Sequence, residues 1–175
     1  KRSFKREVFS WIACIVVTIL LTEFILNFVI INANIPSGSM ENTIMTNDKL
    51  IALRTSYWFN DPKRGDLIIF KYPDDETEWF IKRVIALPGE TVLVKDGKVY
   101  INGSKKALSE PYIKEEPVED FGPYKVPKNG YFVMGDNRNN SQDSRVSDVG
   151  AIHRDELMGR AWIRIWPLDQ FGVIK

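Results

Sequence analysis

The feature that most constrains this chain is a run of 24 mostly apolar residues close to its N-terminus, at positions 8–31. A helix of that length extends about 36 Å at roughly 1.5 Å per residue, which is enough to cross a bilayer core of about 30 Å with some tilt. Glu23 is expected near the outer interface, where its charge costs less than at the bilayer centre. We therefore expect residues 8–31 to form a retained transmembrane anchor. A cleaved signal peptide and a buried core helix are the alternatives.

The distribution of charge predicts how the chain is oriented. Four basic residues, at positions 1, 2, 5 and 6, precede the apolar run, and the next basic residue after it is Lys49. The positive-inside rule then places residues 1–7 in the cytoplasm and residues 32–175 outside the cytoplasm, so that a single span crosses the cell membrane. Residues 32–175 carry 20 Lys and Arg against 21 Asp and Glu, and so present no excess of basic charge to a nucleic acid. We expect the lipid bilayer as a partner and no nucleic acid.

The part after the apolar run predicts a single, mainly β domain. Short stretches rich in Val, Ile and aromatic residues alternate with turn residues, and they predict strands at residues 49–54, 66–72, 79–87, 91–94, 98–101, 131–134 and 159–166. Asp96-Gly97 lies between two of them and favours a two-residue type I′ hairpin turn. Residues 104–128 contain four prolines and many charges, which indicates an irregular excursion rather than a second core. We place this short irregular insert around residues 95–128 of the β domain, which spans 32–175.

The residue types present limit the chemistry that this domain can perform. His153 is the only histidine, and Cys14, within the apolar run, is the only cysteine. A histidine- or cysteine-based metal site and an internal disulfide are therefore excluded, and we expect neither a metal nor a cofactor. A Ser-His-Asp triad would have to use His153, which lies in a loop-like stretch. Acyl transfer by a serine then needs another base, and lysine is the available alternative.

One lysine differs in its surroundings from most of the others. At the ordinary pKa of about 10.4, about one lysine in a thousand is neutral near pH 7.4, whereas a pKa of about 8 leaves roughly a fifth neutral. Lys82 lies in the apolar, strand-like stretch 79–85, where burial would lower its pKa, while most other lysines lie in turns or charged stretches. A Ser39–Lys82 pair is one interpretation of this stretch. A strand lysine that points to solvent is the other.

Several stretches, in order along the chain, resemble those of type I signal peptidases, which carry a Ser-Lys dyad. IPSGSMENTI at 35–44 resembles the nucleophile segment, and DKL at 48–50 and GDLIIF at 65–70 resemble the segments that follow it. IKRVIALPGE at 81–90 is similar to the stretch with the general-base lysine, and GDNRNNSQDSR at 135–145 to an acidic-basic segment. The single anchor and short insert resemble the Gram-positive-type members. The resemblance implies coiled antiparallel β-sheets, the signal peptidase/LexA-like β fold, behind one transmembrane helix.

The resemblance also implies roles for individual residues. Ser39 would be the nucleophile and Lys82 the general base, with the oxyanion held by the Ser39 backbone N–H and the Ser37 hydroxyl. Ser141 would orient the lysine ammonium. Residues expected to support the site are Asp143 and Arg145, as an ion pair, together with Asp136 and Arg138. Apolar residues expected to line shallow substrate pockets, each otherwise a core candidate, are Ile35, Pro36, Met40, Ile44, Phe80 and Ile81.

The implied function is that of a membrane-bound serine endopeptidase that cleaves signal peptides from exported preproteins through an acyl-enzyme. Its substrates would carry small residues at positions −1 and −3 from the cut, and it would act close to the protein translocation channel. A membrane-anchored, non-catalytic signal-peptidase-like binding module is the alternative. A self-cleaving repressor-type protease uses a similar dyad but is soluble. Asn42 departs from the family pattern, which usually has proline there, and we expect it to loosen the loop that carries Ser39.

Overall fold

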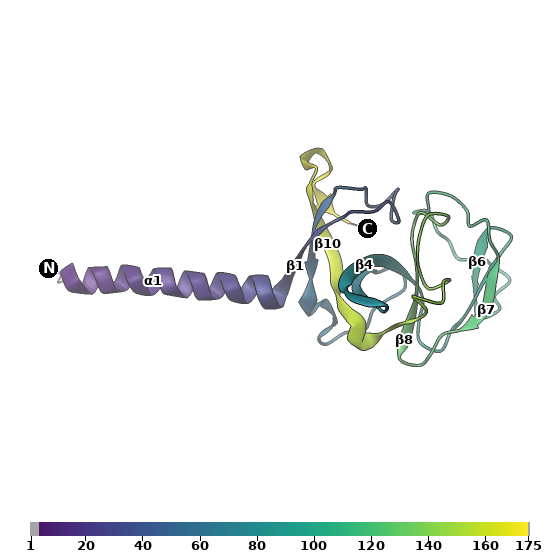
Figure 1. Cartoon of the computed structure of the whole chain (residues 1–175), viewed down its shortest axis with the longest axis horizontal. Coiled ribbons are helices and arrows are strands. Elements are labelled where there is room, and N and C mark those ends of the chain that lie inside the picture. The colour runs from purple at the N-terminus through teal and green to yellow at the C-terminus, as the bar shows by residue number, and fades with distance from the viewer. Residues whose placement is uncertain (1–3, 175) are drawn as a thin grey trace.

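A computed structural model describes residues 4–174 of the chain. The basic residues at positions 1 and 2, on which part of the predicted orientation rests, lie outside this range, and the side chain of Lys5 is likewise not described. Helix α1, Phe4–Phe24, continues as one π-helical turn, Ile25–Val29, and projects from the β body as a single exposed shaft (Figure 1). Residues Arg6–Val29 contain an 18-residue window with a mean hydropathy of 2.4 and are long and apolar enough to span a bilayer. The helical part thus ends two residues before the predicted limit.

The body is built from two antiparallel sheets. The larger has the order β1-β2-β10-β3-β4-β8-β9, with β11 paired to β10, and the smaller has the order β6-β5-β7. The strands of the larger sheet are β1 Ile30–Asn34, β2 Lys49–Leu53, β3 Leu67–Tyr72, β4 Asp75–Ala86, β8 Gly130–Met134, β9 Ile152–His153, β10 Leu157–Trp166 and β11 Gly172–Val173. Those of the smaller sheet are β5 Thr91–Lys95, β6 Lys98–Ile101 and β7 Phe121–Lys125. The predicted mainly β, antiparallel fold is confirmed.

The hairpin between β5 and β6 forms where the Asp-Gly turn predicts it. Asp96 and Gly97 have φ values of 50° and 74°, the left-handed conformations that a type I′ turn requires at both central positions. Lys95 therefore pairs with Lys98, and the two strands continue in register to Val92 and Ile101. All seven predicted strands are present, within a few residues of their predicted ends.

Four strands were not predicted, and β7 is the most instructive. It lies within the stretch expected to be irregular, because its sequence FGPYK contains Gly and Pro. β7 is an edge strand, paired only with β5, and proline is tolerated at an edge because its missing N–H is not needed there. The expected irregular insert is therefore wrong in part: β5 to β7 form a small sheet whose Val92 and Val99 share an apolar cluster with Phe132 on β8 of the larger sheet.

Strand β4 connects the fold to the site. Its first five residues are exposed, whereas Ile81–Ala86 are all buried, because this half lies in the sheet between β3 and β8. Side chains on both faces of this half of the strand are thus buried. The usual alternation of buried and exposed side chains along a strand does not apply here. Lys82 lies in this buried half.

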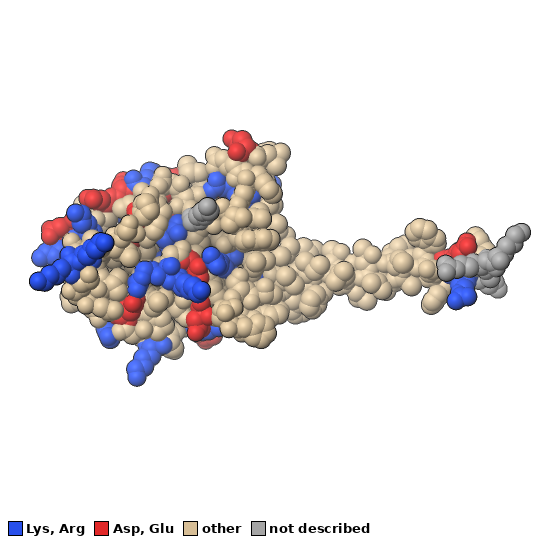
Figure 2. All heavy atoms as spheres, turned by 180° about the vertical axis from the view of Figure 1, so that it is seen from behind, with Lys and Arg blue, Asp and Glu red and all other residues tan. Residues whose placement is uncertain are grey.

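Charge is distributed unevenly over the molecule. Figure 2 shows Lys, Arg, Asp and Glu side chains concentrated on the part of the body that is remote from the helix, while the helix shaft is uncharged along most of its length. Trp58 and Phe59 are exposed just after a 3-10 turn, η2 Arg54–Tyr57, that contacts the end of the helix, whereas Tyr57 is buried. Trp162 and Trp166 on β10 are also half exposed. These four aromatic residues suit a bilayer interface.

Candidate active site

Ser39 lies in a loop between β1 and β2 that packing holds in place. The flanking residues Met40 and Ile44 have no exposed surface and belong to the core cluster that lies beneath β1 and β2. The N–H of Ile44 donates to the carbonyl of Met40 at 2.8 Å, and the N–H of Ile35 donates to that of Asp48 at 3.0 Å. The loop is thus anchored on both sides of the serine. Met40 and Ile44 are core residues and do not line the cavity beside Ser39, where we expected them.

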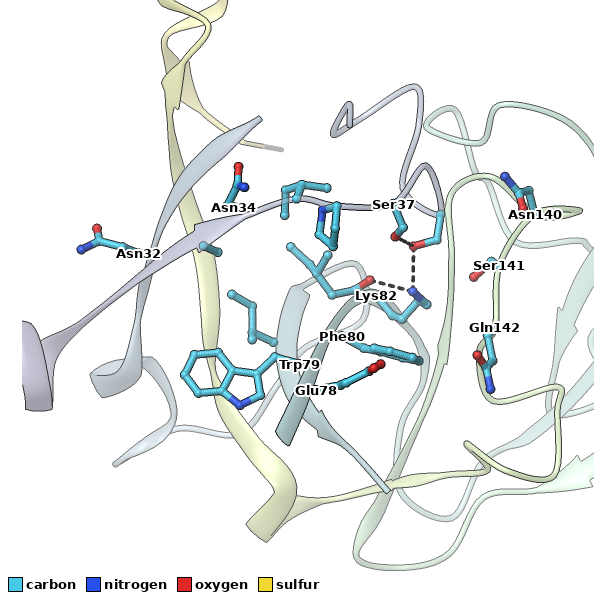
Figure 3. Close-up of a pocket in the computed structure, with 16 residues that line it drawn as sticks. Asn32, Asn34, Ser37, Glu78, Trp79, Phe80, Lys82, Asn140, Ser141 and Gln142 are labelled. Carbon is cyan, nitrogen blue, oxygen red and sulfur yellow. Dashed lines mark hydrogen bonds between the residues drawn. The ribbon is translucent and has the colours of Figure 1, made fainter. Parts of the chain in front are cut away.

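Lys82 reaches Ser39 from the buried half of β4. Its Nζ donates to Ser39 Oγ at 2.8 Å and to the carbonyl of Ile81 at 3.1 Å, and only 4% of the residue is exposed (Figure 3). Burial lowers the pKa of Lys82 to about 8, and the charges of Asp143 and Asp136 oppose part of this shift. The lysine therefore has a neutral form accessible near neutral pH and a hydroxyl within proton-transfer distance.

Both carboxylates that act on Lys82 are paired with arginines. Asp143 accepts from Arg145 Nε at 2.8 Å and from the Gly135 N–H at 3.0 Å, which provides the ion pair that we expected. Asp136 forms a buried ion pair with Arg83 at 2.7 Å and also accepts from Thr43 in the nucleophile loop. Each arginine offsets a negative charge that would otherwise favour the ammonium form. These pairs therefore help to keep the pKa of Lys82 low.

Removal of one of these arginines should shift the dependence of activity on pH. In Arg145→Gln, Asp143 keeps its charge without its cation, which raises the pKa of Lys82 and reduces its neutral fraction. The rising limb of kcat/KM against pH should move to higher pH, with a loss of about three- to tenfold at pH 7 that alkaline pH restores. Arg160→Gln, which removes an exposed arginine, should leave the profile unchanged. A uniform loss at every pH would contradict this electrostatic role.

Two residues of the segment 135–145, neither of them predicted as a site residue, position the nucleophile backbone: Asn137 bonds to it, and Gly135 leaves room for it. The side-chain amide of Asn137 donates to the Gly38 carbonyl at 2.9 Å, and its backbone N–H donates to the Ser39 carbonyl at 3.1 Å. Gly135 is needed because a Cβ at this position would lie 2.4 Å from the Ser39 carbonyl oxygen and 2.2 Å from Ser141 Oγ. The resemblance named this segment, but only the folded backbone shows these contacts.

The remaining polar residues considered for the site differ in their distance from the dyad and in their contacts. Ser37 Oγ is 3.5 Å from Ser39 Oγ, on the same side of the cavity. Ser141 Oγ is buried and has no hydrogen-bond partner among the described residues, so its role in orienting Lys82 stays a prediction. Arg138 is buried and pairs with Glu110 at 2.6 Å, which ties the 135–145 segment to the insert. His153 lies on β9, before a 3-10 turn, η3 Arg154–Glu156, and does not line the cavity.

A cavity of about 680 Å³ opens beside the dyad. Residues of β1 and the loop after it lie on one side of it and residues of β4 on the other, with Ser37 and Lys82 between its two ends (Figure 3). Asn32 and Trp79 lie at one end, and Asn140, Ser141 and Gln142 lie at the other. Of the six apolar residues expected to line substrate pockets, the cavity contains Ile35, Pro36, Phe80 and Ile81.

Asn42 anchors the nucleophile loop rather than freeing it. Its φ of 89° is one that proline, fixed near −65°, cannot adopt. Its side-chain amide donates to the carbonyls of Tyr112 at 2.9 Å and Ile113 at 3.3 Å in the insert. The expectation that Asn42 loosens this loop is therefore wrong for this structure.

Comparison with known proteins identifies the family. Residues 8–166 match the model of a family described as signal peptidase, peptidase S26. A probable signal peptidase I-2 of Synechocystis is 43% identical over 91% of this chain and 73% of its own length, and signal peptidase I of Bacillus amyloliquefaciens is 34% identical over 100% and 97%. A crystal structure of a signal peptidase I from Enterococcus faecalis, 35% identical, superposes on 58% of this chain and 97% of its own with a TM-score of 0.50. The chain therefore belongs to the signal peptidase I family of serine peptidases, peptidase S26.

Proposed function

We propose that this membrane-anchored signal peptidase cleaves preproteins with Ser39 as the nucleophile and Lys82 as the general base. The observation that carries this assignment is the 2.8 Å contact between Lys82 Nζ and Ser39 Oγ, made by a lysine whose pKa burial lowers to about 8. A serine next to a base within hydrogen-bond distance is the arrangement that nucleophilic catalysis requires. The anchor keeps this pair close to membrane-bound substrates.

In the acylation step, neutral Lys82 accepts the hydroxyl proton as Ser39 Oγ attacks the carbonyl carbon of the scissile peptide bond. The oxyanion that forms accepts hydrogen bonds from the Ser39 N–H and the Ser37 hydroxyl, and one such donor contributes roughly 3 kcal/mol to transition-state stabilisation. When the C–N bond breaks, the Lys82 ammonium returns the proton to the leaving amine, which becomes the N-terminus of the mature protein. The signal peptide remains as an ester on Ser39.

In the deacylation step, neutral Lys82 accepts a proton from a water molecule that attacks the ester carbonyl. The same two donors stabilise the second oxyanion, and the proton passes to Ser39 Oγ as the C–O bond breaks. The signal peptide leaves with a new carboxyl terminus, and the serine is regenerated.

The shape of the cavity supports a preference for small residues at −1 and −3. A peptide that lies extended between β1 and β4 directs alternate side chains to the same face, so residues −1 and −3 point together. The apolar side chains of Ile35, on the β1 side, and of Phe80 and Ile81, on the β4 side, line the cavity. We expect alanine-sized side chains to fit there and larger ones to be rejected by steric overlap.

The proposed arrangement at the membrane follows from the anchor and the charges. Residues 1–7 lie in the cytoplasm, residues 8–31 anchor the protein in the cell membrane, and residues 32–175 form the extracytoplasmic catalytic domain. Exposed Trp58, Trp162 and Trp166 rest at the interface. A site at this depth meets the substrate's own apolar segment as it leaves the translocation channel, so that encounter is a search on a surface.

The pH dependence of preprotein cleavage tests this assignment. With a pKa of about 8, Lys82 is neutral in about one tenth of molecules at pH 7, and in most above pH 9. We expect kcat/KM to rise nearly tenfold per pH unit below pH 8 and to level off above it. His153→Ala, the control for the only histidine, should show the same profile. A flat profile between pH 6 and 10 would exclude a lysine base with this pKa.

A further inference from the structure

A second cavity of about 330 Å³ adjoins the one beside the dyad. Ser141 lines both cavities, and its buried Oγ has no partner among residues 4–174. The other wall of the second cavity is the stretch Val118–Phe121, which leads into β7. The side chain of Asn139 joins the two sides, because its Oδ1 accepts from the Val118 N–H at 2.9 Å. The two cavities thus meet at Ser141, along the 135–145 segment.

The position of the anchor indicates in which direction a substrate would lie along the two cavities. Strand β1 follows the membrane helix directly, so the end of the first cavity at Asn32 is the one next to the anchor (Figures 1 and 3). The apolar core of a signal peptide lies in the bilayer and precedes the cut, so residues before the cut occupy this end. Residues after the cut leave at the end formed by Asn140–Gln142. Beyond that end lies the second cavity, toward the sheet of β5, β6 and β7, which Figure 1 shows on the far side of the body from α1.

Two carboxylates and two arginines line the second cavity. Its two arginines are already paired, Arg138 with Glu110 and Arg145 with Asp143. Glu119 and Asp120 are exposed, and neither forms an ion pair with any residue that the structure describes. Asp120 accepts one hydrogen bond, from the Asp96 N–H at 3.0 Å. Two carboxylates thus remain available to a cationic ligand.

Apolar side chains accompany these carboxylates. Val118 is 81% exposed and Val146 40% exposed, one on each side of the second cavity. An exposed valine on each wall offers contact to the aliphatic stem of a lysine or arginine whose charged end reaches a carboxylate. The combination suits a short basic peptide segment.

We propose that this second cavity, lined by Val118, Glu119, Asp120 and Val146, binds the first residues of the mature protein, after the cut, and favours a basic residue among them. The inference rests on the proposed function, because it takes the scissile bond to lie at Ser39. It adds a selectivity on the far side of the cut, set by charge rather than by size. A pair between exposed groups contributes about 1 kcal/mol or less, which corresponds to a preference of up to about fivefold.

A charge scan of the substrate tests this proposal. The full chain in phosphatidylcholine vesicles is given preproteins that differ only by a single Lys, Gln or Glu, placed in turn at the second to the sixth position after the cut. We expect kcat/KM to be about three- to fivefold higher for Lys than for Glu at one or two neighbouring positions. The preference should shrink in 0.5 M salt, because exposed charges are screened.

Variants of the chain separate the outcomes. Glu119→Lys should abolish or invert the preference. Asp155→Lys, an exposed charge reversal outside both cavities, should keep both the preference and the rate on the Gln preproteins. Equal rates for Lys and Glu at every position, or a preference that Glu119→Lys leaves unchanged, would overturn the inference while the proposed function stands. Failure of the unmodified chain to cleave even the Gln preproteins would overturn both this inference and the proposed function.

Discussion

Ser39→Ala should lower the rate of preprotein cleavage by about 10⁴-fold or more, because the Oγ that forms the covalent bond is absent and Lys82 then has no nucleophile to activate. The fold should persist. Among the residues that the structure describes, the side chain of Ser39 bonds only to Lys82 and Ser37, and the loop is held by buried Met40 and Ile44. We expect the free energy of unfolding to change by about 1 kcal/mol or less.

The measurement is kcat/KM on one preprotein, together with the thermal midpoint of the purified full-length variant. Ser144→Ala provides a matched control, since it removes a buried hydroxyl that bonds to the Val133 N–H on β8 rather than to the dyad. It should reduce stability modestly and keep turnover. Cleavage by Ser39→Ala within tenfold of the unmodified rate would show that another group attacks the peptide bond.

Replacement of Lys82 should be as damaging, and two variants distinguish its chemistry from its packing. Lys82→Met keeps most of the side-chain volume but has no base, and Lys82→Arg keeps the cation but cannot become neutral in a protein. Both should lose about 10³-fold or more in kcat/KM. Activity of Lys82→Arg near that of the unmodified protein would rule out proton transfer to this side chain.

Lys82→Met should lose activity but gain stability at pH 7. Burial of the ammonium, which lowers its pKa from 10.5 to about 8, costs the folded state roughly 3 kcal/mol at pH 7. Because the folded pKa of this cation is depressed, the penalty is largest below pH 8 and fades as pH rises toward 10.5. Lys82→Met should therefore raise the thermal midpoint at pH 7 and change it little at pH 10. An inactive variant that is also less stable at pH 7 would contradict this account of the buried lysine.

The sequence predicted Lys82 only in part, for a reason that the sheet makes clear. An apolar stretch predicts a strand, but period-two alternation cannot say whether one residue of it faces solvent. That depends on the neighbours of β4, which are β3 and β8, and β8 is about 50 residues away along the chain. The resemblance to known motifs supplied the pairing with Ser39, and the fold shows the contact.

Other features depend on contacts between segments that are distant in the sequence, and the local sequence could not predict them. Met40 and Ile44 are apolar residues beside the nucleophile, and only the fold shows that they point into the core below β1 and β2. From the sequence, Asn42 suggests a looser loop. Its bonds to Tyr112 and Ile113 cannot be predicted from the sequence, because these residues lie 70 positions or more away along the chain. The Gly and Pro in β7 indicate a loop when only the sequence is considered. Their place in an edge strand depends on how the whole sheet is arranged, which the local sequence does not show.

We expect this chain to cut preproteins at a signal-peptide site through the Ser39–Lys82 pair. The most direct measurement is the intact mass of the products when the full-length protein, in lipid vesicles at pH 9, is incubated with a preprotein that carries an A-x-A sequence before its mature part. We expect two fragments whose masses sum to that of the preprotein plus one water, cut after the second alanine. When phenylalanine replaces that alanine, we expect the preprotein to remain uncut. Cleavage at another bond, or no cleavage of the A-x-A preprotein at a pH where Lys82 is mostly neutral, would contradict this expectation.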